Sequence, residues 1–489
     1  MSSASFTPLD YIVLIVYLIG IISFGIIRGG RQASAQDYFL GKEHIPWWVV
    51  CFAIVAAETS ALTFISIPGL AYLGNMTFLQ VTLGYLLGRI VVSFLFLPAY
   101  YRGELSTAYA FLERRFGRKT RSFASVVFLF TRIAADGVRL FATAIPLKFI
   151  LHVEYPFAIA ILALVALAYT YFGGVRGVIW VDAVQMVVYI GGALVAAVML
   201  VVGFEGGWGG ITRAACEAGK FQIFDLGFGG DFFQKPYTLF AGLLGGGLLS
   251  MASHGTDQLI VQRVLTTRDL AASRRALIGS GIVIVGQFAL FLLVGLLLYG
   301  HYHGMSPSAM GLRRADEIFP MYILGGLPPG VAGFIIAGLF AAALSTLAGS
   351  MSSMSASTVL DLYRPFAGGA SDPAKELRIS RIVTILWAGL LVVSALVFMN
   401  TTQAIVELAL SIASFTYGGL LGTFLLGVLF QRPTQEDALA GFVAGIFIMI
   451  AVISLHLVAW TWFTLVGVSA TLCIGGFLSL LPREQVERT

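Results

Sequence analysis

Charged residues are scarce in this chain. Asp, Glu, Lys and Arg together make up 11% of the 489 residues, whereas 58% are hydrophobic, and the mean hydropathy is +0.90. A soluble protein of this length needs more charge than this to cover its surface. The composition therefore predicts a polytopic membrane protein that is embedded in a lipid bilayer and has no soluble domain of any size.

Cysteine is almost absent as well. Cys51, Cys216 and Cys473 form neither a CxxC pair nor a repeated spacing, so we expect neither a disulfide framework nor a metal cluster. HExxH, a P-loop and a GxSxG with a partner histidine are also missing, and we expect no enzyme. The net charge of +5 is explained by basic loops beside a membrane, so no nucleic-acid partner is expected.

Apolar runs of about 20 residues predict thirteen transmembrane helices. They lie near 9–28, 46–72, 78–100, 123–151, 156–173, 177–203, 236–253, 273–300, 330–360, 379–399, 403–430, 436–457 and 460–481. The first run has no basic region before it and is followed by Arg28 in place of a small-residue cleavage site. We therefore expect a retained span and not a signal peptide.

Most of the 30 Lys and Arg residues fall in loops on one side of these spans. The positive-inside rule predicts that this side is cytoplasmic. The protein is expected in the plasma (inner) membrane. Because the number of spans is odd, the N-terminus is then expected outside the cell and the C-terminus in the cytoplasm. The two long loops near 204–235 and 301–329 are expected outside.

Two of the spans are interrupted. Glu58 lies in the middle of the second span, within Ala-Ala-Glu-Thr-Ser at 56–60, and glycines between 242 and 247 weaken the seventh. These spans lie five apart, as in transporters built from two inverted five-helix repeats around unwound segments. A glycine-rich helix taken alone is more often a close-packing face.

The interruptions suggest how the whole chain is organised. Residues 1–489 are expected to form a single integral membrane domain. We expect a first five-helix repeat at 46–203 and a second at 236–430, with an extra helix at 9–28 before them and two helices at 436–481 after them.

A cluster of oxygen atoms supports a functional interpretation of these breaks. Ala342, Ser345 and Thr346 are spaced i, i+3 and i+4 in the apolar segment 334–360, so two hydroxyls and a nearby carbonyl share one helix face. No full charge follows before Asp361. Neutral oxygens suit a hard, weakly held monovalent cation better than a transition metal, and sodium is the predicted ion.

Ionisable side chains also lie inside the predicted spans, where each would cost about 2–3 kcal/mol or more if it faced lipid. Arg132, Asp136 and Arg139 follow one another at i, i+4 and i+7, so Asp136 can pair with either arginine. The arginine left over could pair with Glu58. A buried ion pair that fixes helix contacts explains this pattern as well as a solute site does. Arg89, next to a small-xxx-small face, is expected to be mainly structural.

Three further polar residues are candidate ligands. Asp182 is the intramembrane carboxylate best placed to serve a second ion, because Gln185 lies one turn away and adds a neutral oxygen; a role in helix pairing is the alternative. His254 follows the glycine-weakened segment, where its ring could meet a ligand, although a lone histidine is more often structural.

Four motifs stand out when the chain is taken as a whole. They are AAETSALT at 56–63 followed by FISIPG, YTYFGGVRGVIWVDAVQ at 169–185, TDQLIVQR at 256–263 and AAALST at 341–346. Together they resemble the sodium:solute symporter family over nearly the whole chain. The resemblance implies an all-α membrane fold with a leucine-transporter-type 5+5 inverted repeat, and a secondary active symporter that imports a solute by alternating access.

The resemblance also implies a main sodium site. Its ligands would be the carbonyl oxygens of Ala56, Thr59 and Ala342 and the hydroxyls of Ser345 and Thr346. Family members that bind a further sodium ion use the carboxylate that matches Asp182, with Ser345 and more serines on the same helix. Those further positions are Ala348 and Gly349 here, so one sodium ion per cycle is expected.

The solute is expected to be small, polar and organic. The sequence is closest in pattern to the sialic-acid transporters, whose solute-facing positions are matched by Ser60, Thr63 and Phe78. The candidate solute-binding residues are Glu58, Ser60, Thr63, Phe78, Thr82, Asp136, Arg139 and His254.

Three positions depart from the sialic-acid pattern. Where those transporters carry Thr, Gln and Arg, this chain has Glu58, Thr82 and Ala135. The cation that would hold a carboxylate is thus missing, unless Arg139, one turn further on, substitutes for it. We therefore expect a solute other than sialic acid, with an amine or hydroxyl groups on Glu58.

Two rival functions fit the same residues. Proton coupling on this fold would use Glu58 or Asp182 as the carrier, and it predicts uptake that is driven by pH without sodium. A solute sensor or receptor is the second rival, but no kinase or other cytoplasmic domain is expected after Pro482. We expect the protein to function as a monomer.

Overall fold

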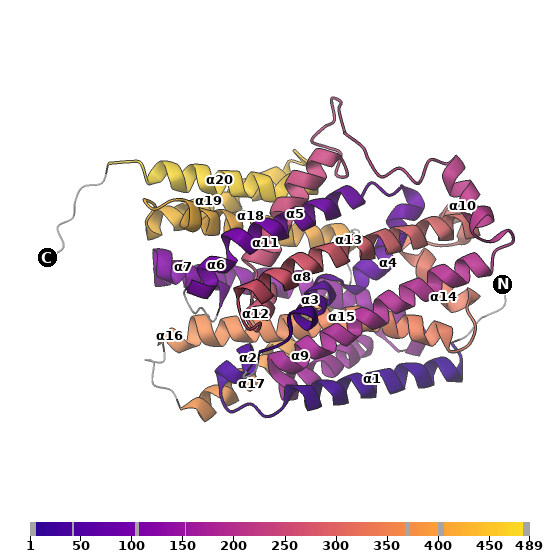
Figure 1. The fold of residues 1–489 in the computed structure, drawn as a ribbon, viewed down its shortest axis with the longest axis horizontal. Coiled ribbons are helices and arrows are strands. Elements are labelled where there is room, and N and C mark those ends of the chain that lie inside the picture. The colour runs from indigo at the N-terminus through magenta and orange to yellow at the C-terminus, as the bar shows by residue number, and fades with distance from the viewer. Residues whose placement is uncertain are drawn as a thin grey trace.

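Every regular element in the described part of the chain is a helix (Figure 1). The computed structural model describes residues 6–41, 44–102, 107–151, 153–366, 372–399 and 405–482. The first half contains α1 (Pro8–Gly29), α2 (Ala35–Leu40), α3 (Trp47–Glu58), α4 (Ala61–Leu73), α5 (Leu79–Leu95), α6 (Leu97–Arg102), α7 (Ala108–Phe116), α8 (Arg118–Leu151), α9 (Tyr155–Val202) and α10 (Gly207–Glu217).

The second half begins with a π-helical turn, η1 (Ala241–Gly246). The α-helices are α11 (Gly247–Gly255), α12 (Gln258–Val264), α13 (Leu270–His301), α14 (Ile318–Gly326), α15 (Val331–Ala356), α16 (Arg364–Phe366), α17 (Pro373–Phe398), α18 (Ile405–Leu429), α19 (Gln435–Ser454) and α20 (Phe463–Leu478). Short turns are η2 (Ser308–Met310), η3 (Ala315–Glu317), the π-helical η4 (Ser357–Tyr363) and η5 (Trp460–Trp462).

The apolar runs become helices because backbone N–H and C=O groups in lipid must be satisfied within their own segment. Among the described residues, eight helices are long and apolar enough to cross a membrane, and the bent pair of α3 and α4 makes a ninth. Each of the thirteen predicted spans falls on helical residues, although positions 403–404 of the eleventh lie outside the described residues. The number thirteen itself stays a prediction.

α9 accounts for part of this difference in number. Its 48 residues would extend about 72 Å as a straight helix, which is more than twice the apolar thickness of a bilayer. The chain bends at Gly174, where φ is 57° and ψ is −165°, a conformation that suits glycine and strains other residues. The predicted spans 156–173 and 177–203 lie on either side of this bend.

The second predicted span is broken where the sequence places Glu58. α3 ends at Glu58, α4 begins at Ala61, and the two helices differ in direction by 66°. Thr59 and Ser60 between them have extended backbones. Ser60 caps α4, because its hydroxyl accepts a hydrogen bond of 3.4 Å from the backbone N–H of Thr63.

The glycines of the seventh predicted span have a packing role. They form η1 and the start of α11 and stay helical, and they lie against α5. A Cβ atom added at Gly84 would come within 2.0 Å of the Gly242 carbonyl oxygen, so the two backbones are in direct contact. The helix is interrupted only later, at Thr256 and Asp257 between α11 and α12. The glycines are therefore not the unwound segment that the sequence suggested.

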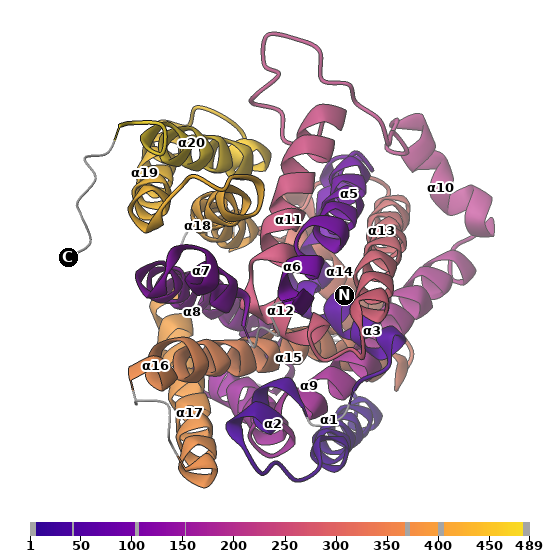
Figure 2. The same ribbon diagram turned by 60° about the vertical axis from the view of Figure 1, so that its left-hand side comes forward.

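α15 lies in the middle of the bundle, beside α9 (Figure 2). Almost all of its residues between Ala332 and Ala356 are buried. α18, α19 and α20 pack together at one side, and α1 flanks α9 at another. The fold thus brings the hydroxyl-rich centre of α15 to the break between α3 and α4.

The contact between α5 and η1 leads to a stability prediction. We expect Gly84→Val to lower the melting temperature of the purified protein, because overpacking of a tight contact typically costs about 1–3 kcal/mol. Gly286→Val on α13 is the matched control, since a Cβ atom there would meet nothing within 4 Å. Equal melting temperatures for the two variants would contradict the packing role of Gly84.

Candidate functional site

Three of the five predicted cation ligands, Thr59, Ala342 and Thr346, meet where α15 passes the break. The hydroxyl oxygen of Thr346 lies 3.2 Å from the carbonyl oxygen of Ala342 and 3.4 Å from that of Thr59. Ser345 is on the same turn of α15, and Ala56 is in the last turn of α3, where a helix end leaves carbonyl oxygens without an intrahelical partner. All five residues are buried. The donor set is made of neutral oxygens only, which fits a hard monovalent cation.

The carbonyl of Thr59 is held in place through its own side chain. The Thr59 hydroxyl donates to the carbonyl of Val55 at 2.8 Å and lies 2.7 Å from the amide nitrogen of Gln287 on α13. The Tyr189 hydroxyl on α9 donates to the oxygens of both Thr59 and Gln287, at 3.1 and 2.9 Å. Three helices thus fix the backbone at the break.

Asp182 lies behind Ser345. Its carboxylate accepts a hydrogen bond of 2.7 Å from the Ser345 hydroxyl and two from Arg263, at 2.7 and 3.2 Å. Gln185 is buried on the same helix, but it does not bond to Asp182. A Cβ atom at Gly349 would lie 2.4 Å from the guanidinium of Arg263, so the missing side chain makes room for this arginine.

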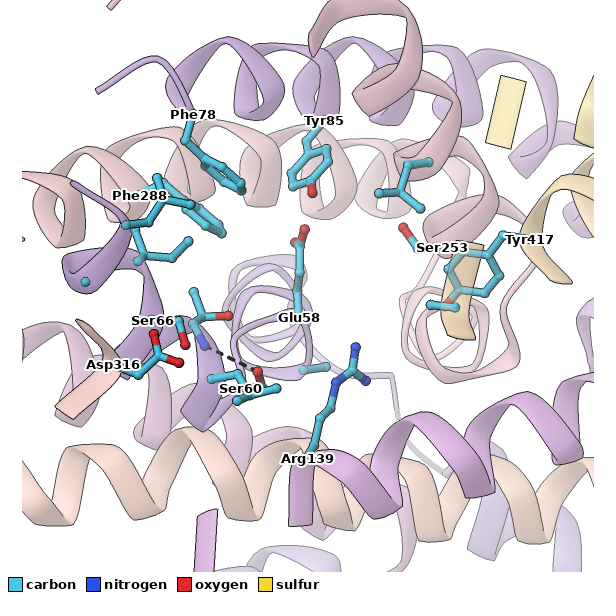
Figure 3. A pocket seen from close by; sticks show the side chains of 18 of the residues that line it. Glu58, Ser60, Ser66, Phe78, Tyr85, Arg139, Ser253, Phe288, Asp316 and Tyr417 are labelled. Atoms are coloured by element: carbon cyan, nitrogen blue, oxygen red, sulfur yellow. Dashed lines mark hydrogen bonds between the residues drawn. The ribbon is translucent and has the colours of Figure 1, made fainter. Parts of the chain in front are cut away.

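A cavity of about 440 Å³ lies beside the break between α3 and α4, and Figure 3 shows side chains that line it. Its walls come from α3, α4, α5, α8, α11, α12, α13, α18 and η3. Six of the eight predicted solute residues line it, namely Glu58, Ser60, Thr63, Phe78, Arg139 and His254. Its volume is in the usual range for small-molecule sites.

The other two predicted solute residues do not line the cavity. Thr82 is fully buried, and its hydroxyl donates to the carbonyl of Leu79 at 2.8 Å. Asp136 is fully buried too, and its carboxylate accepts hydrogen bonds from Arg139 and Ser350. Asp136 is thus placed to orient Arg139 and not to touch a solute.

The partner of Glu58 differs from the one that the sequence suggested. Glu58 forms an ion pair with Arg89 of α5, and its carboxylate lies 3.5 Å from Nε2 of His254. Arg89 is fully buried, and it also donates to the Ser280 hydroxyl at 3.1 Å. Arg132, by contrast, pairs with Asp257 at 2.6 Å. Arg89 therefore balances the charge of Glu58 and is not only a helix-packing residue.

Many residues that line the cavity were not singled out from the sequence. Among them are Tyr85, Phe288, Asp316 and Tyr417. Tyr85, Phe288 and Tyr417 are aromatic residues in apolar helices, where nothing in their spacing marks them, and Asp316 lies in the short turn η3. Gln287, an isolated amide in the apolar run of α13, carried a signal of the kind that marks functional polar groups in membranes.

Asp316 belongs to η3, outside the membrane-spanning helices, and lies beside Ser66 at the edge of the cavity (Figure 3). Burial raises the pKa of the Asp316 carboxyl above its ordinary value of 3.8, while Ser66 and Arg314 counteract part of this rise. η3 itself packs on α4, since a Cβ atom at Gly69 would lie 2.9 Å from the Ala315 carbonyl.

Comparison with protein families and characterised relatives gives a consistent result. The model of the sodium:solute symporter family matches residues 38–445. The sodium/sialic acid symporter NanT of Aliivibrio fischeri is 30% identical over 91% of this chain and 88% of its own length. The sodium/sialic acid symporter SiaT of Proteus mirabilis is 27% identical over 92% and 90%. The sodium-coupled monocarboxylate transporter 2 of Bos taurus is 28% identical over 91% and 72%.

Solved structures share the fold. A Na⁺-coupled sialic acid symporter in a substrate-bound, outward-open state superposes with a TM-score of 0.88 at 24% identity, covering 99% of this chain and all of that one. The nucleobase-cation-symport-1 transporter Mhp1 gives a TM-score of 0.54 at 13% identity, over 90% and 92% of the two chains.

The partly buried carboxyl of Asp316 leads to a prediction for pH. A carboxyl whose pKa is raised by folding destabilises the folded state only when it is ionised, so the penalty is absent at low pH and grows as pH rises through the folded-state pKa. We expect the melting temperature of Asp316→Asn, relative to wild type, to rise between pH 4 and pH 7. Asp231→Asn, at a loop carboxylate that is 53% exposed, is the control. A difference for Asp316→Asn that stays constant or falls with pH would contradict the prediction.

Proposed function

The chain belongs to the sodium:solute symporter family, and we propose that it imports a small polar solute with one sodium ion per cycle by alternating access. It is a multi-pass membrane transporter that couples the transport of sodium to the transport of a small organic solute. The observation that carries the site assignment is the Thr346 hydroxyl, which bridges the Thr59 carbonyl in the break and the Ala342 carbonyl of α15. The sodium ligands are the carbonyls of Ala56, Thr59 and Ala342 and the hydroxyls of Ser345 and Thr346.

Sodium supplies a positive charge between two elements that otherwise meet only through neutral groups. Its binding draws the broken α3–α4 segment onto α15 and so favours one arrangement of these helices. Rocking of a helix bundle about such a midplane site is the usual route of alternating access in inverted-repeat transporters. The inverted repeats at 46–203 and 236–430 are part of this proposal.

The ion and solute sites share adjacent residues. Thr59 offers its carbonyl to the ion, while its neighbours Glu58 and Ser60 line the solute cavity. An ion that fixes Thr59 therefore also fixes the two neighbouring solute contacts. By linkage, the solute must raise the affinity for sodium by the same factor, typically 5–150-fold.

A single sodium ion is supported by the surroundings of Asp182. Its carboxylate already pairs with Arg263 and accepts a hydrogen bond from the Ser345 hydroxyl. Ala348 and Gly349 add no further oxygen ligand from their side chains. In this proposal Asp182 orients a ligand of the single sodium site. Because the Ser345 hydroxyl donates its hydrogen to Asp182, its oxygen lone pairs are free to bind sodium.

Orientation and oligomeric state complete the proposal. The basic helices α7 and α16 lie at one end of the bundle and α10 at the other (Figure 1), which supports a cytoplasmic face at the former end, with the N-terminus outside and the C-terminus inside. Both proposed sites are formed within one chain, and we propose that a monomer is the transporting unit. Nucleic acid is not among its proposed partners.

Reconstituted uptake tests the assignment of the ion. In proteoliposomes with a sodium gradient we expect solute uptake that follows a single-site sodium curve, and at least a tenfold higher half-saturating sodium concentration for Thr346→Ala. Ser355→Ala is the matched control, because this buried α15 hydroxyl has no hydrogen-bond partner among the described residues.

The contrary outcomes are distinct. Uptake driven by a pH gradient in the absence of sodium would favour proton coupling through Glu58 or Asp182. Equal sodium curves for Thr346→Ala and Ser355→Ala would show that the ion binds elsewhere, and a cooperative sodium curve would contradict the single ion.

A further inference from the structure

The solute cavity carries an anionic side chain with unused hydrogen-bonding capacity. One carboxylate oxygen of Glu58, Oε2, faces Arg89 and His254. The other, Oε1, accepts no hydrogen bond from the described residues. The side chain is 20% exposed, and Figure 3 shows its carboxylate pointing into the cavity toward Tyr85. An acceptor oriented in this way suits a donor group of the solute.

A cationic side chain enters the same cavity from α8. Arg139 donates to Asp136 through Nη1 at 2.6 Å, and its other N–H groups have no partner among the described residues. Its side chain is 23% exposed, and Figure 3 shows the guanidinium projecting toward the centre of the cavity. Free N–H groups of an arginine are well suited to a carboxylate.

Each of these charges is already neutralised on the protein side. Glu58 is balanced by Arg89, and the two arginines Arg132 and Arg139 are balanced by Asp136 and Asp257. An anionic solute would therefore bring a charge that these groups do not compensate, and the carboxyl of Asp316 at the cavity edge would oppose it further. A solute that carries both charges brings no net charge and matches both walls.

The remaining wall is aromatic. Phe78 and Phe288 stack with ring centroids 5.3 Å apart and an interplanar angle of 23°, and both line the cavity. Such a surface holds an apolar part of a ligand and leaves orientation to the few polar groups.

We propose that the transported solute is a small zwitterion, with its ammonium group on Glu58, its carboxylate on Arg139 and its carbon skeleton against Phe78 and Phe288. This inference rests on the proposed function, since it names the solute class of the same sodium-coupled site. It excludes sialic acid and simple monocarboxylates as preferred solutes, and it excludes neutral sugars.

Ligand-induced thermal stabilisation in sodium chloride tests this class, with choline chloride as the reference. The zwitterions are L-leucine, 4-aminobutyrate and 6-aminohexanoate, which differ in the separation of their charges, and N-acetylneuraminate and glucose are the comparison solutes. The zwitterion that raises the melting temperature most is then compared with two derivatives, its anionic N-acetyl derivative and its cationic amide. We expect both derivatives to bind at least tenfold more weakly than the zwitterion.

Other results would overturn the inference. It is wrong if N-acetylneuraminate, glucose or the N-acetyl derivative binds as tightly as the best zwitterion, or if no zwitterion stabilises the protein. The proposed function is tested separately by sodium alone, which should stabilise the wild type and not Thr346→Ala. A sodium response together with a non-zwitterionic ligand would leave sodium coupling in place and reject only the solute class.

Two variants assign the charged contacts. Glu58→Gln combined with Arg89→Gln removes the anion without leaving a buried unpaired cation, and it should abolish the preference for the zwitterion over its N-acetyl derivative. Arg139→Gln should abolish the preference for the zwitterion over its amide. Stabilisation by sodium shows that each variant is folded. An equal loss of affinity for all three solutes would contradict the assigned contacts.

Discussion

The structure depends on a backbone interruption inside the membrane. Between α3 and α4 the chain leaves the helix for Thr59 and Ser60, and carbonyl oxygens there lose the partners that a helix supplies. Lipid cannot satisfy such groups, so they persist only where protein, water or an ion takes the place of the missing hydrogen bonds. α15 supplies the hydroxyl of Thr346 at this point, and the proposed cation site consists of neutral oxygens without any formal charge.

The same interruption explains how two ligands can act on each other. Glu58 and Ser60 line the proposed solute cavity, whereas Thr59 between them directs its carbonyl to the proposed ion site. Around them, Gln287 and Tyr189 hold Thr59 from two other helices, while Arg89 holds Glu58 from a third. Local order at the break therefore affects both proposed sites, so binding of one ligand can raise the affinity for the other.

Much of this architecture could be predicted from sequence because it depends on local patterns. Apolar runs marked the helices, Glu58 marked the break, and the i, i+3, i+4 spacing marked the hydroxyls of Ser345 and Thr346. Partner choice could not be predicted in the same way. Arg89 reaches Glu58 from another helix, and Arg263 reaches Asp182 across 81 positions of the chain, so spacing along the chain carried no information about either pair. The glycines near 242 gave a true signal of close packing, but their contact with Gly84 depends on tertiary structure.

Hydrogen–deuterium exchange tests most directly whether sodium joins the break to α15. The amides at 56–64 and 340–350 should exchange more slowly in sodium chloride than in choline chloride, because the ion orders both segments together. Thr346→Ala should lose this protection, and Ser355→Ala should keep it. Sodium protection that is absent from both segments in the wild type, or that persists in Thr346→Ala, would contradict the account.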